Sequence, residues 1–405
     1  AQFQASDPRL ERAIPILLRG LQMCAHETYF DCPYYEQMMY VGDTRLEALV
    51  TYAITADDRL PRKALAMFDA SRLGSGLTQS RYPSHVRQVI PPFSLWYVGM
   101  LSDHALWRGN REWVAKLMPG ARGVLDAFLS YRNEQGLIAG PPGWNFMDWS
   151  HEWSSGIPPQ GDFGASAVIN QLMLLALGWA AELEVWLGEP ELAQRWERLA
   201  ARLAGQIAAT FWDPDCRRFS DDSTHSQASE HAQALAILSG RFSVEMVNGA
   251  ARSLLEDADL TRATIYMRHY LLETFRLLGR PDAVLDRLKL WFDLEAAGLK
   301  TTPETPEPTR SDCHGWGSTP LYHTLATLLG IRPGGFGFES VDIRPMLGTL
   351  TTLRGCMPHP KGMIEANLRR ENGQIHGTVT LPDGLSGVFR DGAREVRLHD
   401  GKQEV

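Results

Sequence analysis

The chain has 405 residues, of which 44% are hydrophobic and 22% charged, and its formal net charge is −8. This composition predicts a folded protein with a large core, and its acidic balance lacks the basic surface that binding to nucleic acid requires. No run of about 18 apolar residues predicts a membrane span, so neither nucleic acid nor membrane is an expected partner.

The five cysteines show no paired spacing typical of a zinc site or a disulfide framework. We therefore expect no metal and no cofactor. The chain begins AQFQASDP, without Met and without a leader pattern, which predicts processing or excision from a longer polypeptide. The compartment, cytoplasmic or periplasmic in a bacterium, and the oligomeric state are left open by these features.

The pattern is mainly helical up to about residue 330. Residues 188–213 place Trp196, Leu203 and Ile207 on one stripe, as in an outer helix, whereas residues 165–183 are apolar almost all round, as in an inner helix. Further helices are predicted over residues 8–25, 44–55, 59–72, 93–107, 111–133, 226–239, 243–256, 264–279, 281–297 and 319–329. This alternation predicts two concentric rings of helices, an α/α toroid. A stacked-helix solenoid is the alternative, but no sequence repeat supports it.

The helical pattern of the sequence ends at Leu329. GIRPGGFGF is typical of a linker, and Asn-Gly and Asp-Gly dipeptides at residues 372, 383, 391 and 400 predict tight hairpins. Between them, alternating residues such as Ile364, Ala366 and Leu368 predict strands with one buried face. Residues 335–405 are therefore expected to form a small antiparallel β domain.

Residues 27–43, ETYFDCPYYEQMMYVGD, mix three carboxylates with aromatic rings, which is typical of a functional site. Asp43 stands just before a predicted helix and would serve as its N-cap, and Asp31 would close an Asx-turn. Glu36 has no such structural role, and its aromatic surroundings suit a general acid. A solvated glutamate on a loop is the alternative interpretation.

A second acidic loop spans residues 299–323, where three prolines exclude regular structure. It carries Glu304, Glu307 and the sequence CHGW, which includes His314 and Trp316. Irregular segments of this length are commonly functional. A solvated proline-rich loop is the alternative, which would explain the glutamates but not CHGW.

Closure of a toroid would bring the two acidic loops together, because its first and last helices become neighbours. Glycoside hydrolysis requires such a pair, one carboxylic acid and one carboxylate on either side of the scissile bond. A middle segment, residues 140–164, offers Trp144, Asp148 and Trp149 to complete a sugar pocket, although tryptophan clusters more often belong to a core.

Three motifs resemble those of the α-L-rhamnosidases of glycoside hydrolase family 78. DCPYYEQMMYVGD (31–43) resembles the DCPxxE…GD motif, NFMDW (145–149) the central DW element, and TTPETPEPTRSDCHGWGSTPLY (301–322) the segment in which a Glu precedes RSDCHxW. The resemblance implies an (α/α)6 barrel over residues 1–334, an antiparallel β-sandwich over residues 335–405, and an inverting enzyme that cleaves terminal α-L-rhamnosyl or closely related residues.

The resemblance also implies residue roles. Glu36 would be the general acid and Glu304 the base, with Glu307 as its rival. The expected substrate-binding residues are Asp31, Tyr35, Tyr40, Asp43, Trp144, Asp148, Trp149, His314 and Trp316. The chain departs from the pattern at Tyr35 and Tyr40, where many members have Arg and Trp. The β domains that usually precede the barrel do not occur in these 405 residues, so we expect either a minimal version of the family or a fragment of a longer protein.

Three other functions stay open at this stage. An unsaturated uronyl hydrolase, or another (α/α)6 carbohydrate enzyme, would need a cationic pocket, and the candidate loops hold few cations beyond Arg45, Arg81 and Arg310. A sugar-binding relative without catalysis would keep the tryptophans and tolerate loss of either glutamate. A helical scaffold for protein partners would leave the acidic loops unexplained.

Overall fold

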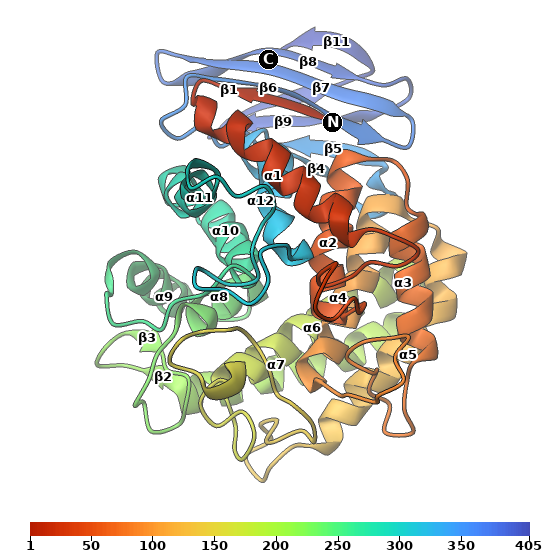
Figure 1. The fold of residues 1–405 in the computed structure, drawn as a ribbon, viewed down its shortest axis with the longest axis vertical. Coiled ribbons are helices and arrows are strands. Elements are labelled where there is room, and N and C mark those ends of the chain that lie inside the picture. The colour runs from red at the N-terminus through yellow and green to blue at the C-terminus, as the bar shows by residue number, and fades with distance from the viewer.

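The computed structural model describes residues 1–405, with a helical body and two sheets at one end of it (Figure 1). The even-numbered helices are α2 (Val41–Ile54), α4 (Pro91–Arg108), α6 (Ala167–Leu187), α8 (Glu230–Ser239), α10 (Arg268–Leu277) and α12 (Thr319–His323). The odd-numbered helices are α1 (Pro8–Cys24), α3 (Arg59–Ala70), α5 (Arg111–Ser130), α7 (Pro190–Phe211), α9 (Val244–Glu256) and α11 (Pro281–Ala296). The helices predicted from the sequence are thereby confirmed, with bounds that differ by a few residues.

Even and odd helices differ in how much of their surface is covered. Helices α2, α4 and α6 bury most of their residues on all sides, whereas α7 buries only a stripe that includes Trp196, Leu203 and Ile207. Each even helix packs against the next one, and α12 packs against α2. The even helices therefore form the inner layer, and the order of neighbours closes on itself.

Helix α6 is the one helix whose length and apolarity would suffice to cross a membrane, which our sequence criterion did not find. Most of it is buried inside the protein, against α4, α7 and α8. A core helix enclosed on all sides has this composition for the same reason as a membrane span, namely the absence of water around it.

Two larger sheets stand beside the helical body. The strands are β1 (Gln2–Ala5), β4 (Ile331–Pro333), β5 (Ser340–Ile343), β6 (Thr352–His359), β7 (Gly362–Glu371), β8 (Gln374–Leu381), β9 (Ser386–Asp391), β10 (Arg394–Leu398) and β11 (Gly401–Glu404). One sheet has the order β1-β6-β7-β8-β11 and the other the order β10-β9-β5-β4. Strands β2 (Trp212–Asp213) and β3 (Arg218–Phe219) form a separate small hairpin.

The expected all-antiparallel domain of residues 335–405 is corrected in two respects. Strand β1 joins from the N-terminus by pairing with β6, and β4 lies before residue 335. The pair β5–β9 is parallel. A strand as short as β1 has no periodic signal of its own, because its partner lies some 350 residues along the chain and only Phe3 is buried. The predicted hairpin is confirmed at Asn372-Gly373, where φ is 52° and 81° and Glu371 lies opposite Gln374, and at Asp391-Gly392, where Asp391 lies opposite Arg394. The hairpins predicted at Asp383-Gly384 and Asp400-Gly401 are wrong, because the strands on either side of each dipeptide belong to different sheets.

Two helix ends also differ from expectation. Helix α2 begins at Val41 with Tyr40 as its N-cap residue, so Asp43 lies in the first turn and is not the N-cap. The helix predicted over residues 319–329 ends as α12 at His323 and continues as a π-helical turn, Thr324–Leu328. Local patterns do not record these ends because tertiary contacts decide where each helix stops.

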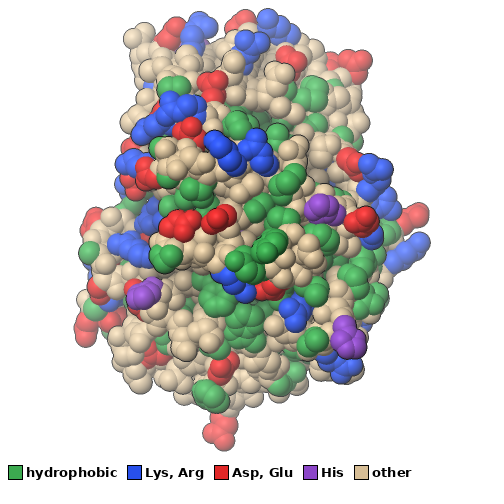
Figure 2. Space-filling view, viewed as in Figure 1, with side chains coloured by type: hydrophobic (Ala, Val, Ile, Leu, Met, Phe, Trp, Pro, Cys, Tyr) green, Lys and Arg blue, Asp and Glu red, His purple; other side chains and the backbone are tan.

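On the face seen in Figure 2, acidic and basic side chains are interspersed with hydrophobic ones, and no broad basic patch gathers there.

Candidate active site

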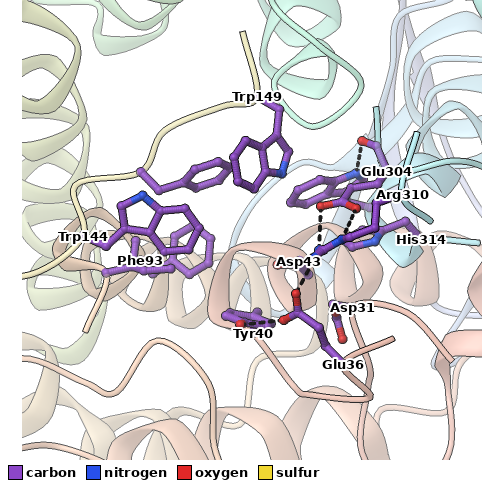
Figure 3. Close-up of a pocket in the computed structure, with 13 residues that line it drawn as sticks. Asp31, Glu36, Tyr40, Asp43, Phe93, Trp144, Trp149, Glu304, Arg310 and His314 are labelled. Atoms are coloured by element: carbon purple, nitrogen blue, oxygen red, sulfur yellow. Dashed lines mark hydrogen bonds and ion pairs between the residues drawn. The ribbon is translucent and has the colours of Figure 1, made fainter. Parts of the chain in front are cut away.

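A pocket lies where the two acidic loops and the middle segment meet (Figure 3). Its lining residues are Asp31, Glu36, Tyr40, Asp43, Ile90, Phe93, Trp144, Phe146, Trp149, Glu304, Arg310, His314 and Trp316. The predicted convergence of residues far apart in the sequence is thus observed, because α12 lies against α2 and carries the proline-rich loop to the first acidic loop.

The first acidic loop is held in shape by the buried Asp31. The backbone N–H of Asp31 donates to the carbonyl of Met38 (2.8 Å), and its Oδ1 accepts from the Met38 N–H (3.0 Å). This bridge across the loop replaces the expected Asx-turn and presents the intervening Glu36 to the pocket. Burial raises the pKa of Asp31.

Glu36 is held by hydrogen bonds at the pocket wall. Tyr40 Oη donates to Glu36 Oε2 (2.7 Å), and Arg81 Nη1 donates to the same Tyr40 oxygen (2.7 Å). The phenol therefore lies between a cation and a carboxylate. Burial, followed by the bond to Glu36, raises the pKa of Tyr40, so this group stays a neutral donor.

Glu304 lies in the proline-rich loop and is almost fully buried. Its backbone N–H donates to the Ser311 carbonyl (2.9 Å), and its carbonyl accepts from Trp316 Nε1 (2.9 Å). These bonds direct the carboxylate into the pocket. Glu307, the rival base, is exposed, accepts from the Thr309 N–H (3.1 Å) and does not line the pocket.

Arg310 joins the two glutamates. Its Nη2 lies 2.8 Å from Glu36 Oε1 and 3.1 Å from Glu304 Oε1, and its Nε lies 3.3 Å from Glu304 Oε2. Figure 3 shows the guanidinium between the two carboxylates. The two loops are thus linked by one cation at the pocket itself.

Asp43 and His314 form a buried pair at the pocket, in which His314 Nε2 lies 2.9 Å from Asp43 Oδ1. Burial raises the pKa of Asp43 to about 6, against the opposing bond from His314. Burial alone would lower the pKa of His314, but the bond to Asp43 and the charges of Asp43 and Asp31 raise it well above its ordinary value. The imidazole is therefore a charged donor at neutral pH.

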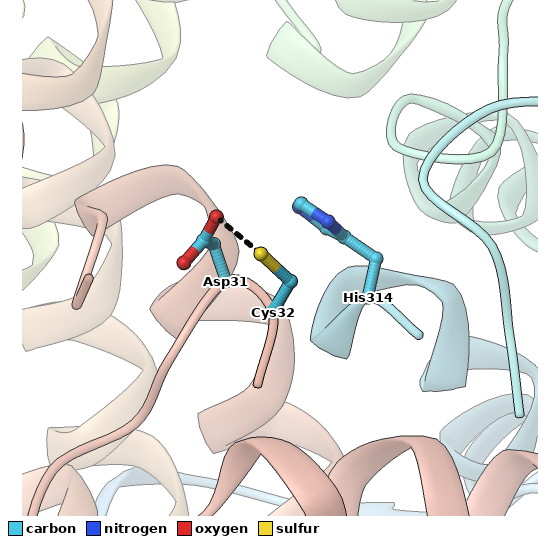
Figure 4. Close-up of side chains that lie close together, drawn as sticks. All are labelled: Asp31, Cys32 and His314. Atoms are coloured by element: carbon cyan, nitrogen blue, oxygen red, sulfur yellow. Dashed lines mark hydrogen bonds between the residues drawn. The ribbon is translucent and has the colours of Figure 1, made fainter. Parts of the chain in front are cut away.

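Asp31, Cys32 and His314 are the one group whose ligand atoms lie close enough for a metal ion, within 4.8 Å of one another (Figure 4). Cys32 Sγ donates to Asp31 Oδ2 (3.2 Å), as a protonated thiol does, and His314 Nε2 is bonded to Asp43. A metal would need the thiolate and a free imidazole nitrogen. His314 Nδ1 has no hydrogen-bond partner, but Cys32 and Asp31 are bonded to each other, and no metal enters the function proposed below.

Aromatic rings line the opposite side of the pocket. Phe146 packs against Trp144 and Trp149, with ring centroids 5.1 and 4.9 Å apart, and Phe93 packs against Phe146. Trp144 Nε1 donates to the Ser155 carbonyl (2.9 Å), which fixes the ring. Such a wall suits the apolar face of a sugar and excludes water from it.

Two expected substrate-binding residues do not line the pocket. Asp148 is fully buried, and its carboxylate accepts from the Trp149 N–H (2.9 Å), the Thr264 N–H (2.7 Å) and His231 Nε2 (2.8 Å). This aspartate ties the middle segment to α8 and to the residues before α10 instead of facing a ligand. Tyr35 is exposed and turns its ring toward Arg310, 6.0 Å from Cζ.

The family of the chain follows from its match to a family model. Residues 1–266 match the bacterial alpha-L-rhamnosidase 6 hairpin glycosidase domain. The chain belongs to this family. The resemblance of its motifs to the α-L-rhamnosidases is thereby confirmed, whereas no curated protein sequence matches the chain.

Solved structures of family 78 rhamnosidases share the fold of this six-hairpin glycosidase family member. It superimposes on the rhamnosidase of Bacillus sp. GL1 with a TM-score of 0.88 at 24% identity, over 97% of this chain and 43% of that one. The rhamnosidase from Klebsiella oxytoca with rhamnose bound gives a TM-score of 0.71 at 22% identity, over 80% and 65% of the two chains. The Streptomyces avermitilis alpha-L-rhamnosidase complexed with L-rhamnose gives 0.82 at 16% identity, over 100% and 42%. This chain spans less than two thirds of the length of each.

Sequence reasoning missed four lining residues of this family member, namely Ile90, Phe93, Phe146 and Arg310. Phe146 and Arg310 lie inside motifs already singled out, so proximity to Trp149 and His314 in the sequence was a usable signal. Ile90 and Phe93 lie at the start of α4 and read as core residues, because only the tertiary arrangement exposes them to a pocket.

Proposed function

We propose that the protein is an inverting glycoside hydrolase that removes terminal α-L-rhamnosyl or closely related residues from a glycoside. The observation that carries this proposal is that Glu36 and Glu304, 268 positions apart in the sequence, line one pocket together with an aromatic wall. Two carboxyl groups on either side of a sugar are the minimum that glycoside hydrolysis requires.

Glu36 is proposed as the general acid and Glu304 as the general base. Glu36 accepts from Tyr40 and lies at the more open side, with 23% of its side chain exposed, where a leaving group would depart. Glu304 is only 5% exposed, and its backbone bonds fix it for activating a water molecule. Asp31, Asp43 and His314 would receive hydroxyl groups of the sugar, and Trp144, Trp149 and Trp316 its apolar face.

The fold is proposed to be the (α/α)6 toroid, with the even helices as the inner ring and the odd helices as the outer ring. Its catalytic domain would cover residues 1–334 and its β domain residues 335–405, with β1 and β4 as strands from the first range that join the sheets of the second domain. The closing contact of α12 on α2 supports this interpretation.

A neutral sugar fits the charges of the pocket better than a uronate. Arg310 is paired with two carboxylates, and Arg81 donates to Tyr40 near Glu36. No cation is left over to receive a substrate carboxylate, which argues against an unsaturated uronyl hydrolase. The presence of rhamnose in two of the similar structures supports a deoxy sugar.

The proposal is tested by hydrolysis of a panel of nitrophenyl glycosides, with the anomer of the released sugar followed by NMR. Glu36→Gln and Glu304→Gln should each lower kcat by at least about 100-fold, since general acid and base catalysis contribute about 10² to 10⁴. Glu307→Gln, in the same loop but outside the pocket, is the matched control and should keep its activity. Full activity of either catalytic variant would contradict the assignment. Release of a sugar whose anomeric configuration is retained would contradict the inverting mechanism.

A further inference from the structure

The position of Arg310 between the two proposed catalytic residues has a geometric consequence. One atom, Nη2, contacts Glu36 Oε1 at 2.8 Å and Glu304 Oε1 at 3.1 Å. The distance between Glu36 Oε1 and Glu304 Oε1 is therefore at most the sum of these two contact distances. An inverting enzyme holds the sugar and the attacking water in the space between its two carboxyl groups, and Nη2 of Arg310 stands in this space, between the two facing oxygens.

The guanidinium thus occupies space that the reaction requires. While Arg310 contacts both glutamates, the scissile bond and the attacking water cannot lie between them. Arg310 must leave at least one carboxylate before a sugar ring reaches the bottom of the pocket.

The contacts indicate which carboxylate Arg310 leaves. It makes two contacts with Glu304, six residues away in the same loop, and one with Glu36 on the other loop. The Arg310 side chain is 49% exposed and that of Glu36 23% exposed, and an ion pair so open to water is weak. Beside it, the exposed Tyr35 ring provides a surface on which a guanidinium can rest.

We propose that Arg310 is a displaceable gate that closes the empty site by bridging Glu36 to Glu304 and withdraws from Glu36, but not from Glu304, when a sugar enters. The inference rests on the proposed function. Arg310 competes with the substrate in the free protein and positions Glu304 in the complex. A residue that simply binds sugar would have the opposite effect on affinity.

The test is the Kd of free L-rhamnose, measured by calorimetry for the wild type, Arg310→Gln and Lys300→Gln. Lys300 is exposed near the start of the same loop and outside the pocket, so its variant removes a nearby charge and should bind as the wild type does. Arg310→Gln should bind the sugar about two- to fivefold more tightly, the fold-change expected when one partly exposed ion pair no longer has to be broken.

Salt gives a second measurement that needs no variant. Raising the ionic strength from about 0.01 to 1 M shortens the Debye length from about 30 to 3 Å, which weakens the bridge. Sugar binding by the wild type should therefore tighten, whereas binding by Arg310→Gln should not change. If Arg310→Gln fails to fold, as judged by circular dichroism, Arg310→Lys replaces it and should show a smaller response to salt.

The outcomes separate the gate from the proposed function. Equal or weaker binding by Arg310→Gln, or wild-type binding that does not respond to salt, overturns the gate and leaves the glycosidase assignment intact. Absence of L-rhamnose binding to every variant contradicts the proposed sugar and removes the gate with it.

Discussion

The hydrogen bond from Tyr40 to Glu36 connects the first acidic loop to Arg81 on the next segment. The carboxylate of Glu36 keeps one orientation because the phenol, itself held by a guanidinium, donates to it. A ring without the hydroxyl group at position 40 would fill the same space but would leave the Glu36 carboxylate free to rotate.

Removing that phenol therefore tests whether the orientation of Glu36 matters. Tyr40→Phe should lower kcat by about 10- to 100-fold, because a hydrogen bond to a charged group contributes about 1.5 to 3 kcal/mol, with a smaller change in KM. Steady-state kinetics measures both. Tyr34→Phe, on a side chain 81% exposed in the same loop, is the control, and an equal loss there would point to general disturbance of the loop.

The Asp43–His314 pair predicts a dependence of stability on pH. Because the pKa of Asp43 is raised from 3.8 to about 6, the folded protein holds this proton more tightly than the unfolded chain. Its contribution to the free energy of unfolding therefore falls as the pH rises from about 4 to 6. His314, whose pKa is raised well above 6.5, stays protonated across this window.

Asp43→Asn removes the titration of this carboxyl group. Between about pH 4 and 6, the free energy of unfolding of Asp43→Asn should fall less than that of the wild type. The difference between the two falls should be about 1 to 3 kcal/mol. Urea denaturation at a series of pH values measures the difference. Asp286→Asn, at an exposed position on α11, should keep the wild-type slope, and an unchanged slope in Asp43→Asn would contradict the assigned pKa.

The packing of the proline-rich loop against helix α2 depends on Gly315, which lets the loop approach α2 closely. A Cβ at this position would lie 2.0 Å from Glu47 Oε1. Glu47 is fully buried, neither of its carboxylate oxygens has a hydrogen-bond partner, and burial followed by the charge of Asp43 raises its pKa well above the ordinary value. A protonated, tightly enclosed side chain cannot move away easily.

We expect Gly315→Ala to lower the free energy of unfolding by about 1 to 3 kcal/mol through overpacking, and to lower activity through displacement of His314. Gly123→Ala is the matched control, because no atom lies within 4 Å of its added Cβ and alanine favours the helix interior by about 0.5 to 1 kcal/mol. Thermal unfolding of both variants measures the contrast, and equal stability of the two would show that the loop accommodates a side chain.

At the scale of the whole molecule, the N-terminal strand ties the β region to the start of the helical body. Strand β1 pairs with β6, and Phe3 is buried in the core shared with residues of the helical body. The sheet that contains β6 is therefore completed by residues that directly precede α1.

Phe3→Ala should lower the free energy of unfolding by about 3 to 5 kcal/mol, as large-to-small changes of buried aromatic residues do. Urea denaturation followed by tryptophan fluorescence, which reports on the helical body, measures the effect. Gln4→Ala, on the exposed face of the same strand, should leave stability within about 0.5 kcal/mol. A loss confined to far-UV signals of the sheet would instead indicate that the two parts unfold independently.

The helices, the hairpins at Asn372-Gly373 and Asp391-Gly392, and the two acidic loops could be predicted from the sequence, because these features depend on local chemistry. Helical periodicity records which faces are covered, proline excludes regular structure, and Asn372-Gly373 favours the positive φ angles of a tight turn. The carboxylates Glu36 and Glu304 were recognisable for the same reason, as charged residues in segments that their neighbours keep irregular.

Which of these residues line the pocket depends on contacts between segments far apart in the sequence. Asp148 sits in a motif as promising as that of Glu36, yet contacts from α8 and from Thr264 use its whole carboxylate. Arg310 became part of the site because the loop carrying it lies against a loop some 270 residues earlier in the chain. Contacts between distant segments depend on the closure of the helical body, and no local pattern encodes the partner that a side chain will meet.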